Sequence, residues 1–172
     1  MVKYSIAVAG MLSLLSACKP PQKNDSGLSF DAFHYTVTKK VEAENGAVVS
    51  AHPLASKAGV SILKSGGNAV DAAIATQLAL AVVYPNAGNL GGGGFMVARL
   101  GNGETVSLDY REMAPGSSHR DMYLDAAGNA DLDKSQLGHL SSGVPGTVAG
   151  LFASHKYAKL PFEKLIQPAI EL

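Results

Sequence analysis

The apolar pattern of the chain first becomes regular near residue 47, where a β-type run is followed by two helices. Residues 47–51 form a short run of small and branched side chains. Pro53 can occupy the first turn of a helix that continues to the glycine pair 66–67. Residues 69–83 form the next helical pattern, which is apolar around nearly its whole circumference. A helix without a polar face is expected in a core.

Residues that favour helix ends mark both boundaries of this apolar helix. Asn68 is a natural N-cap, and Asp71 three positions later lies at the positive end of the helix dipole. Pro85 cannot continue the helix and is expected to end it.

Four consecutive glycines, residues 91–94, separate this helix from two strand-like runs. The runs cover residues 95–100 and 104–110, and Gly101-Asn102-Gly103 between them is a hairpin signal. Apolar and polar side chains alternate in the second run, so one of its faces should be buried. The glycine run therefore enters a hairpin.

The last third of the chain has a helical pattern. A loop over residues 141–146 precedes a helix over residues 147–157, and Pro161 begins a further helical segment that Pro168 should kink or shorten. No capping glycine or polar tail follows residues 168–172, so the chain is expected to be interrupted there. Helices mixed with a hairpin indicate α and β layers.

The N-terminus has the pattern of an export signal. Lys3 precedes an apolar stretch over residues 6–15 that is shorter than the about 20 residues of a spanning helix. We therefore expect a signal peptide of lipoprotein type over residues 1–17, a tether over residues 18–40, and a partial domain over residues 41–172.

Leu15-Ser16-Ala17-Cys18 resembles the bacterial lipobox, in which cleavage leaves a lipidated N-terminal cysteine. Cys18 is the one cysteine of the chain, so it is the candidate lipidation site and cannot form an internal disulfide. The alternative is an ordinary signal peptide cut near Ala17. Either reading predicts a periplasmic protein, and the first adds a lipid anchor in a bacterial membrane.

Composition narrows the function classes. The 172 residues are 47% hydrophobic and 16% charged, enough for a packed domain, and the 14 basic residues equal the 14 acidic ones. Nucleic acid is therefore not an expected partner. The glycine run follows a helix and opens a strand, opposite to a phosphate-binding loop, so a structural role is expected. No cofactor or metal is expected, because no metal-ligand spacing connects His34, His52, His119, His139 and His155.

Arg111 is the candidate binding residue that the chemistry alone suggests. It follows the second predicted strand and precedes Pro115, and strand ends are common places for sites. A guanidinium can bind both oxygens of a carboxylate in one fork. The alternative is that Arg111 pairs with Asp109 or Glu112.

Five ordered blocks of the sequence resemble the gamma-glutamyltranspeptidase family. They are His-Pro-Leu-Ala-Ser at 52–56, Gly-Gly-Asn-Ala-Val-Asp-Ala-Ala at 66–73, Gly-Asn-Leu-Gly-Gly-Gly-Gly-Phe-Met at 88–96, Tyr-Arg-Glu-Met-Ala-Pro at 110–115 and Gly-Val-Pro-Gly-Thr-Val-Ala-Gly at 143–150. The similarity runs from about Val48 to the last residue.

The resemblance implies an N-terminal nucleophile hydrolase, a four-layer αββα sandwich made as a precursor that cuts itself into large and small subunits. This chain would be the N-terminal part of the large subunit, an incomplete α+β fold. The family cleaves the γ-glutamyl amide of glutathione through a threonine acyl-enzyme and transfers the glutamyl group to water, an amino acid or a peptide.

The resemblance assigns one site residue to this chain. Arg111 would bind the α-carboxylate of the glutamyl group. The nucleophile belongs to a Thr-Thr-His type motif of the small subunit, and that context is absent around Thr36, Thr38, Thr76, Thr105 and Thr147. No catalytic residue is therefore assigned, and this chain alone should be inactive.

The sequence leaves two alternatives open. The parent could be a cephalosporin or glutaryl acylase of the same superfamily, whose substrates have a related acyl chain. The chain could also be a non-catalytic exported lipoprotein that binds γ-glutamyl compounds or only scaffolds a partner.

Overall fold

The structure, a computed structural model, describes residues 33, 40–88 and 90–172. Its helices and strands confirm the α+β class. In chain order they are α1 (Pro53–Lys64), α2 (Ala69–Val83), β1 (Phe95–Arg99), β2 (Thr105–Asp109), α3 (Leu132–Gln136), the 3-10 helix η1 (His139–Ser141), α4 (Thr147–His155) and α5 (Phe162–Glu171). The signal peptide, Cys18 and most of the tether lie outside the described residues.

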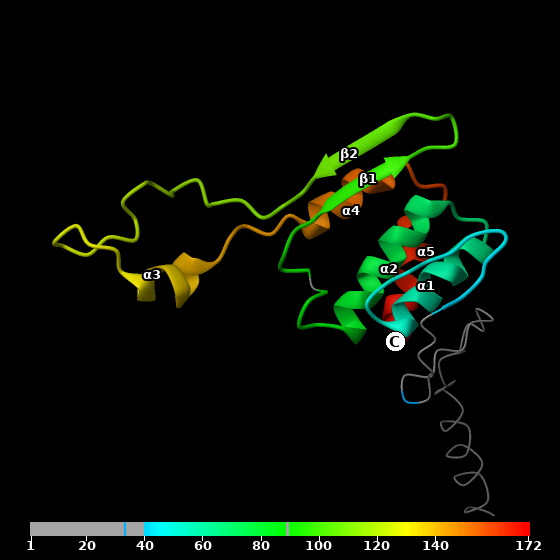
Figure 1. Ribbon diagram of the computed structural model, residues 1–172, viewed down its shortest axis with the longest axis horizontal. Helices are drawn as coiled ribbons and strands as arrows, with labels where there is room; N and C mark the ends of the chain where they lie inside the picture. The colour runs from blue at the N-terminus through cyan, green and yellow to red at the C-terminus, as the bar shows by residue number, and fades with distance from the viewer. Residues whose placement is uncertain (1–32, 34–39, 89) are drawn as a thin grey trace, which may run out of the picture.

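The helices α1, α2 and α5 lie side by side, and the β1–β2 hairpin with α4 lies against them (Figure 1). The core contains apolar side chains from α1, α2, α4 and α5, namely Ile62, Val70, Ile74, Ala75, Leu78, Leu151 and Leu165. A second cluster of Ala55, Ala58 and Ala79 joins α1 to α2. Alanine contacts of this kind allow the two helices to approach closely.

The start of α1 explains the position of His52. Its Nδ1 accepts the backbone N–H of Leu54 at 3.3 Å, and its backbone is extended, as an N-cap requires. The imidazole therefore caps the helix that Pro53 begins.

The start of α2 is held by a capping box. The Asn68 side chain accepts the N–H groups of Val70 and Asp71, and the Asp71 carboxylate accepts the N–H of Asn68 at 2.7 Å. The predicted helix bounds are confirmed. Its predicted burial is confirmed only in part, because Ala73 and Val82 remain exposed within the described structure.

Asp71 also connects α2 to the turn between α4 and α5. Its carboxylate is fully buried and accepts the backbone N–H groups of Lys159 and Leu160 at 3.0 and 2.9 Å. Asn68 adds a hydrogen bond from its side-chain amide to the carbonyl of Tyr157 at 2.7 Å. The capping residues of one helix therefore fix the position of two others.

The hairpin confirms the predicted strands to within one residue. β1 and β2 are antiparallel, with Phe95 opposite Asp109 and Val97 opposite Ser107. Alternate side chains of both strands are half-buried, as the pattern of the second run predicts. The turn has Gly103 at a φ of 88°, a conformation that glycine adopts without strain.

The prediction of a strand over residues 47–51 is wrong for the described structure. The segment has no strand assignment, although Val48 and Ser50 are half-buried and Val49 is exposed in the alternating pattern of a strand. A strand needs a neighbour that shares its backbone hydrogen bonds. The only sheet among the described residues is the β1–β2 pair, and it does not extend to this segment.

The effect predicted for Pro168 is also wrong as far as helix length is concerned. α5 continues through Pro168 to Glu171, and the N–H of Leu172 bonds to the Pro168 carbonyl at 3.3 Å. Pro168 is buried, so packing of its ring offsets the missing backbone donor. Helix α4 ends at His155, two residues before the predicted end.

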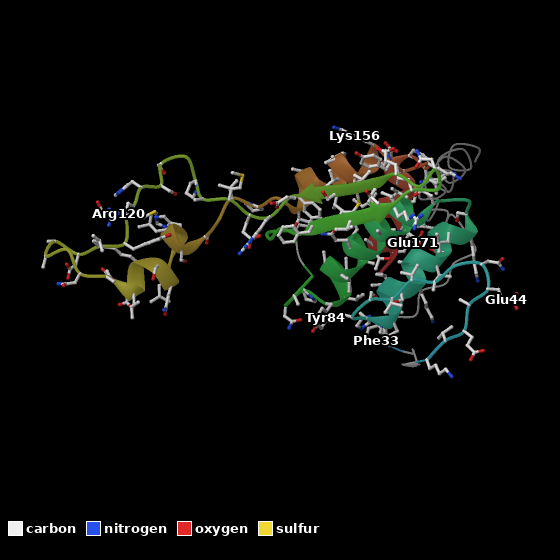
Figure 2. All side chains as sticks on the ribbon, turned by 45° about the horizontal axis from the view of Figure 1, so that its top comes forward. Phe33, Glu44, Tyr84, Arg120, Lys156 and Glu171 are labelled. Atoms are coloured by element: carbon white, nitrogen blue, oxygen red, sulfur yellow. The ribbon has the colours of Figure 1, made fainter. Side chains whose placement is uncertain are left out.

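Residues 116–142, here called the arm, project away from the helices and hairpin (Figure 1). Arg120 on the arm lies far from Tyr84 and Lys156 on the body of the molecule (Figure 2). The arm contains α3, which the sequence did not predict and which has no buried residue. Among the described residues, no helix is both long and apolar enough to cross a bilayer.

Candidate functional site

Three of the sequence blocks meet at the end of the hairpin opposite its turn. The carbonyl of Gly92 accepts the backbone N–H groups of Gly146 and Thr147 at 2.9 and 3.0 Å. Met113 and Val144 exchange a pair of backbone hydrogen bonds at 3.1 and 2.8 Å. The glycine run, the 110–115 block and the 143–150 block are therefore one local assembly.

The glycine run is needed because its backbone packs directly against the backbone of the 110–115 block. A Cβ atom at Gly93 would lie 2.5 Å from the amide nitrogen of Glu112 and 2.7 Å from the Cα of Arg111. Both neighbours are main-chain atoms that cannot rotate away, so only glycine fits at this position. This confirms the structural role that the sequence predicts for the run.

Tyr110 is surrounded by glycines from two directions. A Cβ at Gly94 would lie 2.8 Å from the ring carbon Cε2, and a Cβ at Gly150 would overlap the ring itself. The Tyr110 carbonyl lies so close to Gly146 that a side chain there is also impossible. The ring therefore occupies space that these glycines leave open.

Tyr110 and its glycines were not identified as site components from the sequence. The available signal was the four-residue spacing of Gly146 and Gly150, which places the N-cap residue of α4 and a residue of its first turns on one face. Two glycines on one helix face indicate that another segment packs closely there.

Arg111 lies directly beyond β2 and is exposed. Its backbone N–H donates to Oδ1 of Asp109 at 3.0 Å. Within the described part of the chain, its guanidinium makes no ion pair with Asp109 or Glu112, the alternative considered from the sequence. A guanidinium on a firmly held backbone, with its donors turned to solvent, can bind a carboxylate in a fork. The binding role itself stays a prediction.

Tyr110 also contributes a titratable phenol to this assembly. Burial raises the pKa of the Tyr110 phenol above its ordinary value of 10.0, and the side-chain hydrogen bond with Gln77 lowers it by less. The phenol is therefore protonated at neutral pH. Across residues 33, 40–88 and 90–172, no group of three or more His, Cys, Asp or Glu side chains could hold a metal ion.

A cavity of about 940 Å³ lies elsewhere, between residues 45–50 and the helices α1 and α2. Its lining is mainly apolar and includes Val48, Leu63, Ala72 and Leu80. None of the three assembled blocks lines this cavity. It is a space between packed elements and has no candidate chemistry.

Comparison with known proteins gives consistent matches. The sequence profile of the family described as gamma-glutamyltranspeptidase matches residues 55–172. The glutathione hydrolase proenzyme of Escherichia coli (strain K12) is 50% identical over 172 residues, covering 97% of this chain and 29% of that protein. The glutathione hydrolase proenzyme of Pseudomonas sp. (strain A14) is 53% identical over 140 residues, covering 81% of this chain and 24% of that protein.

Solved structures agree with the sequence comparison. Gamma-glutamyltranspeptidase from Helicobacter pylori superposes with a TM-score of 0.74 at 51% identity, over 77% of this chain and 38% of that chain. A cephalosporin acylase from Bacillus halodurans is more distant, with a TM-score of 0.64 at 30% identity, over 83% of this chain and 27% of that chain. This chain thus spans about a quarter of the length of its first curated relatives.

Proposed function

Because this chain belongs to the gamma-glutamyltranspeptidase family, we propose that it is part of an enzyme that cleaves the γ-glutamyl amide of glutathione. The glutamyl group passes to water, an amino acid or a peptide. Both curated relatives described above are named glutathione hydrolase proenzymes, which supports this reaction over others on the same fold.

The observation that supports a substrate role for this chain is the guanidinium of Arg111, which forms no ion pair within the described part of the chain. It is exposed, and Gly93 packs against the backbone that bears it. A free α-carboxylate is the part of a γ-glutamyl donor that offers two parallel acceptor oxygens. The fork geometry of arginine matches it with two charge-assisted hydrogen bonds.

The chemical step requires groups that this chain does not provide. A threonine hydroxyl in the small subunit attacks the γ-carbonyl carbon, and the α-amine of the same threonine accepts the hydroxyl proton. The C–N bond then breaks, and the departing amine takes that proton. Water or an acceptor amine attacks the resulting ester and releases the threonine. The contribution of this chain is to hold the donor by its carboxylate.

The competing function is glutaryl or cephalosporin acylase activity, because the cephalosporin acylase from Bacillus halodurans also resembles this chain. A glutaryl group has the same carboxylate as a γ-glutamyl group and lacks only the α-amine. Arg111 would therefore bind either donor. The higher identity to glutathione hydrolases, 50% against 30%, favours the γ-glutamyl donor.

The test uses the full-length, self-processed protein with three chromogenic amides. These are the γ-glutamyl donor, the glutaryl donor without the amine, and the 4-aminobutyryl donor without the carboxylate. We expect γ-glutamyl hydrolysis to be fastest and 4-aminobutyryl hydrolysis to be slowest but still measurable. Faster glutaryl hydrolysis would establish an acylase, and no hydrolysis of any donor would favour the non-catalytic lipoprotein.

We further propose that the precursor is exported to the periplasm, is cut into two subunits and is anchored by a lipid on Cys18. Support comes from the export pattern around residues 6–15, the lipobox-like residues 15–18, and the word proenzyme in the names of the relatives. Labelling with a radioactive fatty acid should mark the wild-type protein and not the Cys18→Ala variant. Equal labelling would exclude this anchor.

A further inference from the structure

We propose that Tyr110 is a positioning residue for substrate binding: its ring, held between Gly94 and Gly150, fixes the face of the strand end from which Arg111 projects. The inference rests on the proposed carboxylate-binding role of Arg111. It adds a residue that acts through the guanidinium without touching substrate.

Side chains alternate between the two faces along the hairpin. Val106 and Leu108 are half-buried on the inner face of β2, and Tyr110 continues that face. Neighbouring residues of an extended strand point to opposite faces. With Tyr110 turned inward, Arg111 must turn outward, where it is exposed.

Backbone pairing and ring packing hold Tyr110 firmly in its inward direction. Tyr110 extends the strand ladder by one pair, because its N–H donates to the Gly94 carbonyl at 3.0 Å. Its ring fills the space that Gly94 and Gly150 leave, on the strand side and the α4 side respectively. A shift of one residue would exchange the two faces, place the ring in solvent and turn the guanidinium inward.

The ring and the hydroxyl of Tyr110 differ in how closely they are held. The Tyr110 hydroxyl lies 3.4 Å from Oε1 of Gln77 and 3.4 Å from the carbonyl of Phe95. Both distances are at the long limit for an O–H donor, so these hydrogen bonds are weak. The ring, rather than the hydroxyl, is therefore what fixes the strand end.

The experiment compares four variants of the full-length, self-processed enzyme: Tyr110→Phe, Tyr110→Ala, Arg111→Leu and the double variant Tyr110→Ala with Arg111→Leu. The readouts are kcat and KM for a γ-glutamyl anilide and kcat/KM for the 4-aminobutyryl anilide, which lacks the carboxylate. The phenylalanine variant is the matched control, because it keeps the ring and removes only the hydroxyl.

We expect Tyr110→Phe to retain the wild-type KM within about twofold and Tyr110→Ala to raise it about tenfold, with kcat within about threefold. The kcat/KM of Tyr110→Ala for the 4-aminobutyryl donor should equal that of the wild type, since this donor has no carboxylate for Arg111 to bind. In the double variant the KM should equal that of Arg111→Leu, because Tyr110 acts only through the guanidinium. Should Tyr110→Ala fail to self-process, Tyr110→Leu is judged by the same readouts.

Each other outcome overturns a specific statement. An unchanged KM in Arg111→Leu would refute the proposed role of Arg111. A raised KM in Arg111→Leu together with an unchanged KM in Tyr110→Ala would refute only the positioning role of Tyr110. An equal decrease of kcat/KM for both donors in Tyr110→Ala would also refute the positioning role. So would a KM for the double variant tenfold above that of Arg111→Leu. In both cases Tyr110 would support the protein structure in general and would not act through Arg111.

Discussion

The carbonyl oxygen of Gly92 accepts the backbone N–H of Thr147 at 3.0 Å, which joins the glycine run to the first turn of α4. Between them the chain forms the hairpin, the Arg111 strand end and the whole arm. The candidate site therefore depends on main-chain contacts between distant segments. Substitutions at these contacts test the assembly while the Arg111 side chain itself is kept.

Gly93→Val should prevent folding and self-processing of the full-length enzyme. A valine side chain would enter the backbone of Arg111 and Glu112, which we expect to cost about 3 kcal/mol or more. The matched control is Gly101→Ala, where a Cβ would meet open space. Self-processing and melting temperature are the measurements, and normal values for Gly93→Val would contradict the structural role of the run.

Asp71→Ala should destabilise the protein strongly. The change removes the acceptor of the part-buried backbone N–H groups of Asn68, Lys159 and Leu160, at about 1 kcal/mol for each lost hydrogen bond. Asp71→Asn keeps one acceptor oxygen and should be intermediate. The exposed Asp121→Ala is the control. The measurement is the midpoint of denaturant unfolding. Equal midpoints for Asp71→Ala and Asp121→Ala would contradict the stabilising role of the Asp71 carboxylate.

The turn of the arm at Asp125 should weaken in acid. Backbone hydrogen bonding from Asn129 is the main cause that holds the pKa of this carboxyl below its ordinary value of 3.8. A lowered pKa means that the stabilisation is present above pH 3.8 and is lost as pH falls through the folded-state pKa. An NMR titration of the Asp125 carboxyl carbon should have its midpoint below 3.8, and a midpoint above it would contradict the hydrogen bonds.

The outer face of the hairpin should make the 172-residue chain self-associate when it is produced alone. Phe95 is 64% exposed and Val97 is 83% exposed, next to each other on that face. Light scattering should show oligomers that the double substitution Phe95→Thr with Val97→Thr reduces. A monomer of the unsubstituted chain at all concentrations would contradict this prediction.

Local signals predicted the elements that local chemistry determines. The bounds of α2 follow from the Asn68 cap, and the hairpin follows from alternation around the turn at residues 101–103. The prediction for residues 47–51 was wrong because strand formation depends on a neighbour, which no local pattern supplies. Pro168 stays within α5 because tertiary packing of its ring outweighs its helix-breaking tendency.

The sequence suggested Arg111 as the binding residue, a role that stays a prediction, and it did not reveal the packing around Tyr110 that holds the backbone beside it. Strand-end position and fork chemistry identified Arg111 from the sequence, and the family resemblance gave it a ligand. The packing of Tyr110 against Gly150 depends on how α4 meets the hairpin, which is a tertiary relationship. The glycine spacing in α4 indicated a close contact but not its partner.

The most direct test of the carboxylate-binding role is Arg111→Leu in the intact, self-processed enzyme, measured as kcat/KM for glutathione at limiting concentration. Loss of two charge-assisted hydrogen bonds predicts a decrease of about 100-fold, and Arg111→Lys should recover only part of it. An undiminished kcat/KM in the leucine variant would show that Arg111 does not bind the substrate.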